Sequence, residues 1–228
     1  MCGRFTLRSP GNLIIEQFGL DFQGDLSYIV PRYNIAPTQS VAIVRGLERQ
    51  LGFLNWGLVP FWSKDPKGGA KMINARSETV ATKPAFRNAI KKKRCLVPTD
   101  GYFEWVKEGK KKKPFWIRMA DERPFMMAGL WERWRDKSVA DSEPLETFTI
   151  LTTTSNSLTS DVHDRMPVIL GSNDYERWLD PELQDANELS YMFESYNSGE
   201  MRMDEVNDRV NSVRNDDEQC VELVRSLF

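Results

Sequence analysis

The feature that most constrains the fold is a run of short apolar segments separated by turn-forming residues, between positions 95 and 153. The segments are rich in β-branched and aromatic side chains, and Lys107-Glu108-Gly109-Lys110 and Asp121-Glu122-Arg123 are typical hairpin turns. Many short strands with few helices between them indicate a largely antiparallel sheet that curls toward a barrel. The strands expected in this run cover residues 95–98, 102–106, 114–119, 125–131 and 148–153.

Shorter patterns flank this run. Residues 41–45 and 50–56 predict a hairpin, residues 166–170 a strand, and residues 61–71 a glycine-containing loop. Ser9 followed by Pro10 predicts an N-cap and first helical position, opening a helix that ends near Phe18. Helices are also expected over residues 84–93 and 173–179. The fold class predicted is α+β, one domain over residues 1–228 with a curled, barrel-like sheet and flanking helices.

Composition narrows the class of protein. The chain has 228 residues, 40% hydrophobic and 28% charged, which is typical of a globular protein, and its net charge of −2 argues against coating nucleic acid by bulk charge. No apolar run is long enough to span a membrane, and the N-terminus lacks a signal-peptide pattern. Three distant cysteines without a C-x-x-C pair argue against a disulfide framework or a zinc site. We therefore expect a cytoplasmic protein, a monomer, with no metal and no membrane partner.

The second residue, Cys2, can undergo a reaction that is closed to an internal cysteine. Its side chain is small enough that Met1 is normally removed, which would leave a thiol and an α-amine on adjacent carbons. Such a pair can condense with an aldehyde and close a thiazolidine ring. The amine has an ordinary pKa near 7.7–8.0, so roughly a tenth to a sixth of it is neutral at pH 7. A nearby cation such as Arg4 would favour the thiolate, although an idle thiol remains the alternative.

Three further polar groups lie among turn-forming or aromatic residues. Asn74 follows the glycine-rich loop, where it could be catalytic or could cap a turn. Glu104 stands between two aromatic residues, so in a strand it would face away from both, either toward solvent or as a general acid–base group with a raised pKa. His163, the sole histidine, suits proton transfer near neutral pH but could also be a surface-loop residue.

Taken together, these residues belong to an ordered series of motifs. The series is Cys2-Gly3-Arg4-Phe5, Arg32-Tyr33-Asn34-Ile35-Ala36-Pro37, Trp56-Gly57-Leu58-Val59-Pro60, Ile73-Asn74-Ala75-Arg76-Ser77-Glu78-Thr79, Gly101-Tyr102-Phe103-Glu104-Trp105 and His163-Asp164-Arg165-Met166-Pro167. It resembles the SRAP family, the SOS-response-associated peptidases, which are also described as abasic-site processing proteins. The resemblance extends from Cys2 to Asn211.

The resemblance implies a protein that binds single-stranded DNA and traps abasic sites, whose ring-opened sugar exposes an aldehyde. Cys2 would be the nucleophile and form a thiazolidine crosslink, and Asn74 would hold the new N-terminus. Glu104 would shuttle protons, and His163 would contact the sugar-phosphate and support β-elimination, an AP-lyase activity. No cofactor is implied, and a cytoplasmic protein of this kind would join the nucleoid when bound to DNA.

The same resemblance suggests how DNA is held. Arg4 and Arg76 are the expected phosphate ligands, with Asn34 and Thr152 as further polar contacts. Trp62 is a candidate platform for a neighbouring base, and such stacking is worth about 1–3 kcal/mol per base. Phe61 beside it is expected to pack in the core.

Two other functions fit the same residues. An N-terminal cysteine near Asn, Glu and His also suits a self-processing cysteine peptidase, for which the one bond that must be cleaved is Met1–Cys2. A non-catalytic single-strand DNA-binding module, with an incidental Cys2, is the other alternative. A DNA species that survives denaturation would distinguish the crosslinking enzyme from both.

Overall fold

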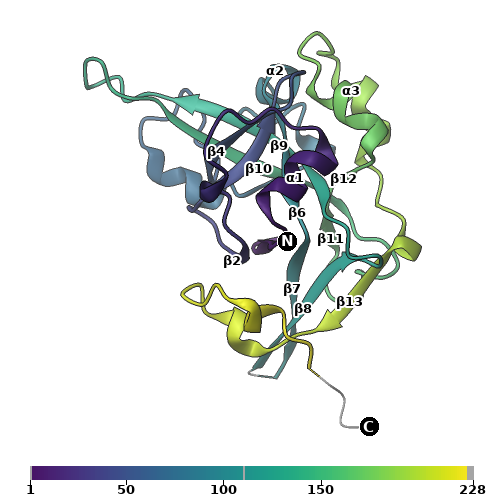
Figure 1. Cartoon of the computed structure of the whole chain (residues 1–228). Helices are drawn as coiled ribbons and strands as arrows, with labels where there is room; N and C mark the ends of the chain where they lie inside the picture. Colours follow the sequence, from purple (N-terminus) through teal and green to yellow (C-terminus); the bar gives the residue numbers. More distant parts are fainter. Residues whose placement is uncertain (1, 110, 225–228) are drawn as a thin grey trace.

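The computed structural model describes residues 2–109 and 111–224, and its upper part is a closed ring of strands (Figure 1). The ring runs in the order β10-β4-β3-β6-β9 and closes because β10 pairs with both β4 and β9. The predicted α+β class and barrel-like sheet are confirmed. The ring strands are β3 (Ser40–Arg45), β4 (Gln50–Trp56), β6 (Arg94–Thr99), β9 (Phe125–Trp134) and β10 (Leu145–Thr154).

Two pairings of β10 are parallel rather than antiparallel. Phe148 lies opposite Trp56 on β4, and further along the same edge Ile150 lies opposite Asn74 on β5 (Asn74–Arg76). The sequence did not predict β5, because three residues are too short to show the alternation that marks a strand. This strand fixes the position of Asn74 against the ring.

A second sheet lies below the ring in Figure 1, in the order β13-β8-β7-β1-β2. The chain passes from β6 to β7 through the single residue Asp100. Gly101 opens β7, and no larger residue fits there, since a Cβ would lie 2.4 Å from Trp116 Nε1 and 2.8 Å from the Ile117 carbonyl. The predicted turn at 107–110 includes Lys110, which lies outside the described residues. The strands are β1 (Phe5–Leu7), β2 (Arg32–Ile35), β7 (Gly101–Glu108), β8 (Lys111–Met119) and β13 (Met201–Glu205).

The helices are short, and two of the three predictions need correction. Pro10, not Ser9, is the N-cap of α1 (Gly11–Phe18), because the Ser9 hydroxyl donates to Asp100 instead. In the segment predicted as a helix over 84–93, only α2 (Ala89–Lys92) is α-helical, and isolated turns precede it. The third prediction is confirmed in position, as a 3₁₀ turn that leads into α3 (Tyr175–Leu179).

Two irregular segments also differ from expectation. The loop over 61–71 ends in a 3₁₀ helix (Pro66–Lys71) that is capped by the Asp65 carboxylate. The single strand predicted over 166–170 is divided into β11 (Arg165–Pro167), which pairs with β10, and β12 (Ile169–Leu170), which pairs with β9. The division occurs at Val168, whose N–H donates to the Leu151 carbonyl on β10 and whose carbonyl accepts from the Ala128 N–H on β9.

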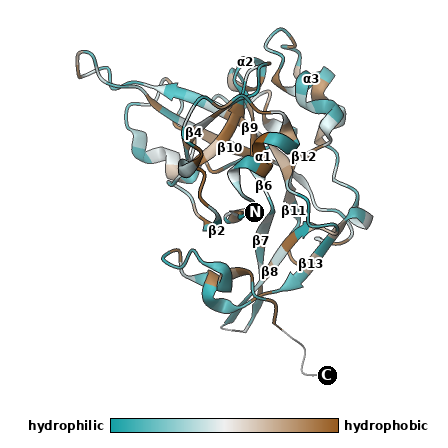
Figure 2. Ribbon diagram, in the orientation of Figure 1, coloured by the Kyte–Doolittle hydropathy of each residue, from teal (hydrophilic) through white to brown (hydrophobic). Residues whose placement is uncertain are grey.

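The hydrophobic residues form two clusters, one on each face of β7. The larger fills the ring, where Figure 2 shows hydrophobic colouring on β9 and β10, and it extends to Cys2 and Tyr102. The smaller contains Phe103 on the opposite face of β7, under the C-terminal segment. Side chains alternate between these clusters as the period of a strand requires.

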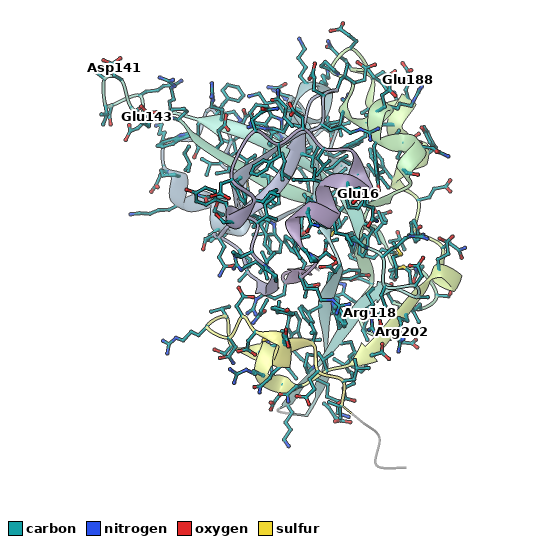
Figure 3. The ribbon with its side chains drawn as sticks, in the orientation of Figure 1. Glu16, Arg118, Asp141, Glu143, Glu188 and Arg202 are labelled. Atoms are coloured by element: carbon teal, nitrogen blue, oxygen red, sulfur yellow. The ribbon has the colours of Figure 1, made fainter. Side chains whose placement is uncertain are left out.

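The outer edge of the second sheet pairs like charges. Arg118 on β8 lies directly opposite Arg202 on β13, and Figure 3 shows the two residues side by side. Asp204 accepts a hydrogen bond from each, at 2.7 and 2.9 Å. Its carboxylate therefore offsets a repulsion that directly opposed like charges would otherwise impose on the sheet.

No helix in the described parts of the chain is both long and apolar enough to span a membrane.

Candidate active site

The N-terminal segment lies at the centre of the molecule, between the ring and the second sheet (Figure 1). Phe5 on β1 pairs with Tyr102 on β7, and the Phe103 N–H donates to the Arg4 carbonyl at 3.0 Å. This antiparallel pairing carries the chain start along β7 toward Glu104. Cys2 is completely buried in the larger hydrophobic cluster.

Asn74 contacts Cys2 directly. Its side-chain Nδ2 donates a hydrogen bond of 2.8 Å to the Cys2 carbonyl. The Asn74 Oδ1 atom is buried and accepts no hydrogen bond from the described residues. The amide thus holds the main chain of Cys2 with its donor, while its acceptor remains available to a further N–H or O–H group.

Glu104 is buried beside this segment, with only 4% of its surface exposed. It lies on the face of β7 opposite Phe103, as the alternation predicted, so the solvent-facing interpretation is wrong. Burial raises the pKa of its carboxyl group above the ordinary value, and the nearby Asp164 charge acts in the same direction. The group can therefore hold a proton at a higher pH than an exposed glutamate can.

The Cys2 thiol is not activated in the way expected from Arg4. Burial raises its pKa well above the ordinary value, and the negative charge of Glu104 raises it further. The Arg4 guanidinium is directed away, to Asn34 and the Val210 carbonyl. The thiol is therefore protonated at neutral pH.

His163 lies in the loop between β10 and β11 and is partly buried. Its Nδ1 accepts the Arg165 N–H at 2.9 Å, which favours the neutral tautomer with its proton on Nε2, whereas the carboxylate of Asp164 beside the same nitrogen favours a proton on Nδ1. Burial lowers the pKa of the imidazole below its ordinary value, and this effect outweighs the opposing influence of Asp164, whose Oδ1 lies 2.8 Å from Nδ1. The ring is therefore neutral at physiological pH.

Tyr102, to which the sequence analysis gave no role, is a further candidate residue of this site. Its side chain is fully buried, and it shares a face of β7 with Glu104 because the two are separated by one residue. Burial raises the pKa of its phenol, and the nearby ionisable groups of Cys2 and Glu104 act in the same direction. Strand periodicity within Gly101-Tyr102-Phe103-Glu104 was the signal that could have identified it.

The expected DNA ligands occupy different environments. Asn34 is completely buried, and its amide bonds only to protein: Oδ1 accepts from Arg4 at 2.7 Å, and Nδ2 donates to carbonyls of the C-terminal segment. In this structure Asn34 therefore orients Arg4, and its expected contact with DNA stays a prediction. Thr152 is also completely buried and lies 3.5 Å from the Ala75 carbonyl, so it presents no hydroxyl at the surface.

Three other residues are exposed. Arg76, at the end of β5, is exposed two residues from Asn74. Trp62 is 50% exposed, and Phe61 is 44% exposed, so the expectation that Phe61 packs in the core is wrong. The Trp134 indole donates to the Ser63 carbonyl at 2.7 Å and fastens this loop to the ring.

Within residues 2–109 and 111–224, no group of three or more His, Cys, Asp or Glu side chains is arranged to hold a metal ion. The candidate site combines the Cys2 thiol, the Asn74 amide, the buried Glu104 carboxyl group with its raised pKa, and the partly buried imidazole of His163.

The chain is similar to known proteins over nearly its whole length. The family model described as "SOS response associated peptidase (SRAP)" matches residues 1–213. The abasic site processing protein YoqW of Bacillus subtilis (strain 168) is 42% identical over 226 residues, covering 97% of this chain and 99% of the relative. The abasic site processing protein YedK of Escherichia coli (strain K12) is 32% identical over 198 residues, covering 83% of this chain and 85% of the relative.

A solved structure is also similar. The crystal structure of a protein from Bacteroides thetaiotaomicron superimposes with a TM-score of 0.88 at 32% sequence identity, covering 98% of this chain and 100% of that one. Family model, relatives and fold lead to one conclusion: this chain belongs to the SRAP family.

Proposed function

We propose that this protein processes abasic sites in single-stranded DNA and forms a covalent crosslink through Cys2 once Met1 has been removed. The observation that carries the proposal is the Asn74–Cys2 hydrogen bond beside the buried carboxyl group of Glu104. The names of the relatives, abasic site processing proteins, support the same substrate.

The proposed reaction has two covalent steps. The α-amine of Cys2 adds to the C1′ aldehyde of the ring-opened sugar and loses one water, giving an imine. The Cys2 sulfur then bonds to C1′ while its proton passes to the imine nitrogen, which closes a thiazolidine. The whole reaction releases one water and neither gains nor loses a proton.

The raised pKa values of Glu104 and Cys2 suit these two reaction steps. A protonated Glu104 can donate to the departing hydroxyl group of the first step and recover a proton afterwards. The protonated thiol supplies the proton that the nitrogen requires in the second step. The free Asn74 Oδ1 acceptor can orient the amine for the first attack.

Strand cleavage is the competing outcome. An imine at C1′ acidifies the C2′ hydrogen, and loss of that proton breaks the C3′–O bond and releases the phosphate. His163 is neutral and partly exposed, so it can accept a proton or contact the sugar-phosphate. We propose that His163 acts in this β-elimination rather than in thiazolidine formation.

Two exposed side chains, Arg76 and Trp62, are the proposed DNA contacts. Arg76 offers a charge for a phosphate, and the half-exposed indole of Trp62 offers a stacking surface. Arg4 is fixed by Asn34 and can contact a phosphate with the rest of its guanidinium.

The proposal is tested by incubating the mature protein with an abasic single-stranded oligonucleotide and running a denaturing gel. A shifted band is expected for wild type and absent for Cys2→Ala. A tetrahydrofuran oligonucleotide, which has no aldehyde, is the matched control. Binding to both oligonucleotides without a covalent product would favour the DNA-binding module, and proteolysis of a denatured protein substrate without crosslinking would favour the peptidase.

A further inference from the structure

Arg165, at the start of β11, connects three segments around the site. Its guanidinium donates to both carboxylate oxygens of Glu78, with one of these bonds at 2.9 Å, and Nη2 also donates to the Thr152 carbonyl at 2.6 Å. Glu78 follows β5, which carries Asn74, and Thr152 lies on β10 between the two outer strands. The side chain therefore spans β10 and joins the β11 side to the β5 side.

The main chain of Arg165 contacts the imidazole. Its N–H donates to His163 Nδ1 at 2.9 Å, and the same loop is closed where the Ser155 N–H donates to the Asp164 carbonyl at 3.0 Å. The orientation of His163 thus depends on where β11 begins. The main chain there is held by the pairing of Arg165 with Thr154 on β10, and the side chain adds a bidentate ion pair with Glu78 in which the arginine is only 8% exposed.

We infer that Arg165 and Glu78 form a positioning pair that holds the His163 imidazole beside the strand carrying Asn74, with the imidazole proton on Nε2. Neither residue needs to contact the reacting atoms. The pair aligns the proton-transfer group with the strand that holds Cys2. The part of this inference that concerns strand cleavage rests on the function proposed above.

The electrostatic surroundings of His163 are consistent with such fixing. Asp164 and Arg165 lie on its own loop, and Glu104 on β7 is close enough to be influenced by Asp164. Hydrogen bonding to Arg165 holds the pKa of Glu78 below its ordinary value, so the pair stays ionised. If the Arg165–Glu78 ion pair were lost, the His163 ring would no longer be held in one orientation relative to Asp164 and Arg165.

The single histidine makes the inference directly measurable. In uniformly ¹⁵N-labelled protein at pH 8, a long-range ¹H–¹⁵N spectrum contains one imidazole, and its two nitrogen shifts report the tautomer. Wild type should show Nδ1 as the unprotonated nitrogen. Glu78→Gln, which keeps shape but removes the charge, should shift both nitrogens toward a mixture of tautomers.

The matched control is Glu188→Gln. Glu188 is paired with Arg177 and is 54% exposed at the side chain, close to the 50% of Glu78, but it lies at the outer margin of the molecule (Figure 3). It should leave the imidazole spectrum unchanged. Arg165→Lys retains a positive charge opposite Glu78. The fraction of the Nε2–H tautomer should therefore stay closer to wild type in Arg165→Lys than in Arg165→Met.

Strand cleavage of an abasic oligonucleotide supplies the second measurement. Glu78→Gln should reduce the cleavage rate about tenfold, less than the 10²–10⁴-fold typical of deleting a general acid–base group, while crosslink yield stays near wild type. An unchanged imidazole spectrum in both Glu78→Gln and Arg165→Met would overturn the inference, whatever happens to cleavage. If wild type itself forms no covalent product, the proposed function fails, but the spectroscopic result still decides the positioning pair.

Discussion

The side-chain amide of Asn74 is hydrogen-bonded to the main-chain carbonyl of Cys2 at 2.8 Å, across 72 positions of sequence. Asn74 lies on β5, which pairs with β10 of the ring. Cys2 directly precedes β1, which pairs with β7 of the second sheet. The junction between the two sheets therefore creates the site.

Asn74→Ala should slow crosslinking without preventing it. The variant loses one orienting hydrogen bond, worth about 0.5–1.5 kcal/mol, which corresponds to roughly a two- to tenfold lower rate. Single-turnover crosslinking measured on denaturing gels gives this rate. A variant with an unchanged rate would show that the Asn74 contact does not orient the nucleophile.

Glu104→Gln separates proton transfer from DNA binding. Loss of a general acid–base group should reduce the crosslinking rate by about 10²–10⁴-fold, while single-strand affinity stays close to wild type because the shape is preserved. Fluorescence anisotropy with a tetrahydrofuran oligonucleotide measures the affinity. A parallel loss of affinity and rate would place Glu104 in DNA binding instead.

The same variant has a predictable pH dependence of stability. The pKa of Glu104 is raised in the folded state, so the wild-type carboxyl contributes stability below its unfolded pKa of about 4.3 and loses it as the pH rises through the folded value. Glu104→Gln cannot ionise. Its free energy of unfolding relative to wild type should therefore increase from pH 4 upward and level off above the folded pKa, as measured by urea denaturation. A constant difference across this range would contradict the raised pKa.

Arg76 and Arg4 should respond differently to truncation. Arg76→Ala should lower the salt dependence of single-strand binding by about 0.7 in log–log slope and leave stability unchanged, because its side chain is exposed. Arg4→Ala should in addition lower the free energy of unfolding by about 1–3 kcal/mol, because it leaves the buried Asn34 Oδ1 without its donor. Binding titrations at several salt concentrations, together with urea denaturation, test both. An equal loss of stability in the two variants would contradict the assignment.

Arg94 is a buried structural cation that no sequence pattern identified. Its guanidinium donates to carbonyls at the ends of α2 and α3, and burial lowers its pKa to about 10. Arg94→Met leaves these acceptors unpaired and should cost about 3 kcal/mol or more in urea denaturation. The exposed neighbour Arg87→Met should change stability by less than about 0.5 kcal/mol. Equal effects of the two substitutions would contradict this role.

The ring strands could be predicted because each has enough β-branched and aromatic residues to show strand character. Strands β1 and β5 could not, since each has three residues and is ordered only by its partners. The helix start at Ser9 was misassigned for a similar reason: the Ser9 hydroxyl donates a hydrogen bond to Asp100, 91 positions away.

The site residues were identified as chemical types, but their environments were not. Burial of Glu104 and Cys2 follows from the packing of two sheets, and no local pattern encodes it. Asn34 was expected among the DNA contacts, but no local pattern indicated that its Nδ2 group donates to three carbonyls of the C-terminal segment.

The central claim is that Cys2, as the N-terminal residue, captures the aldehyde of an abasic site. Intact mass spectrometry of the protein after incubation with an abasic oligonucleotide tests this most directly. The account predicts a species with the mass of the chain without Met1, plus the oligonucleotide, minus one water, and predicts its absence for Cys2→Ala. Crosslinking by protein that retains Met1, or an equal yield from Cys2→Ala, would contradict the account.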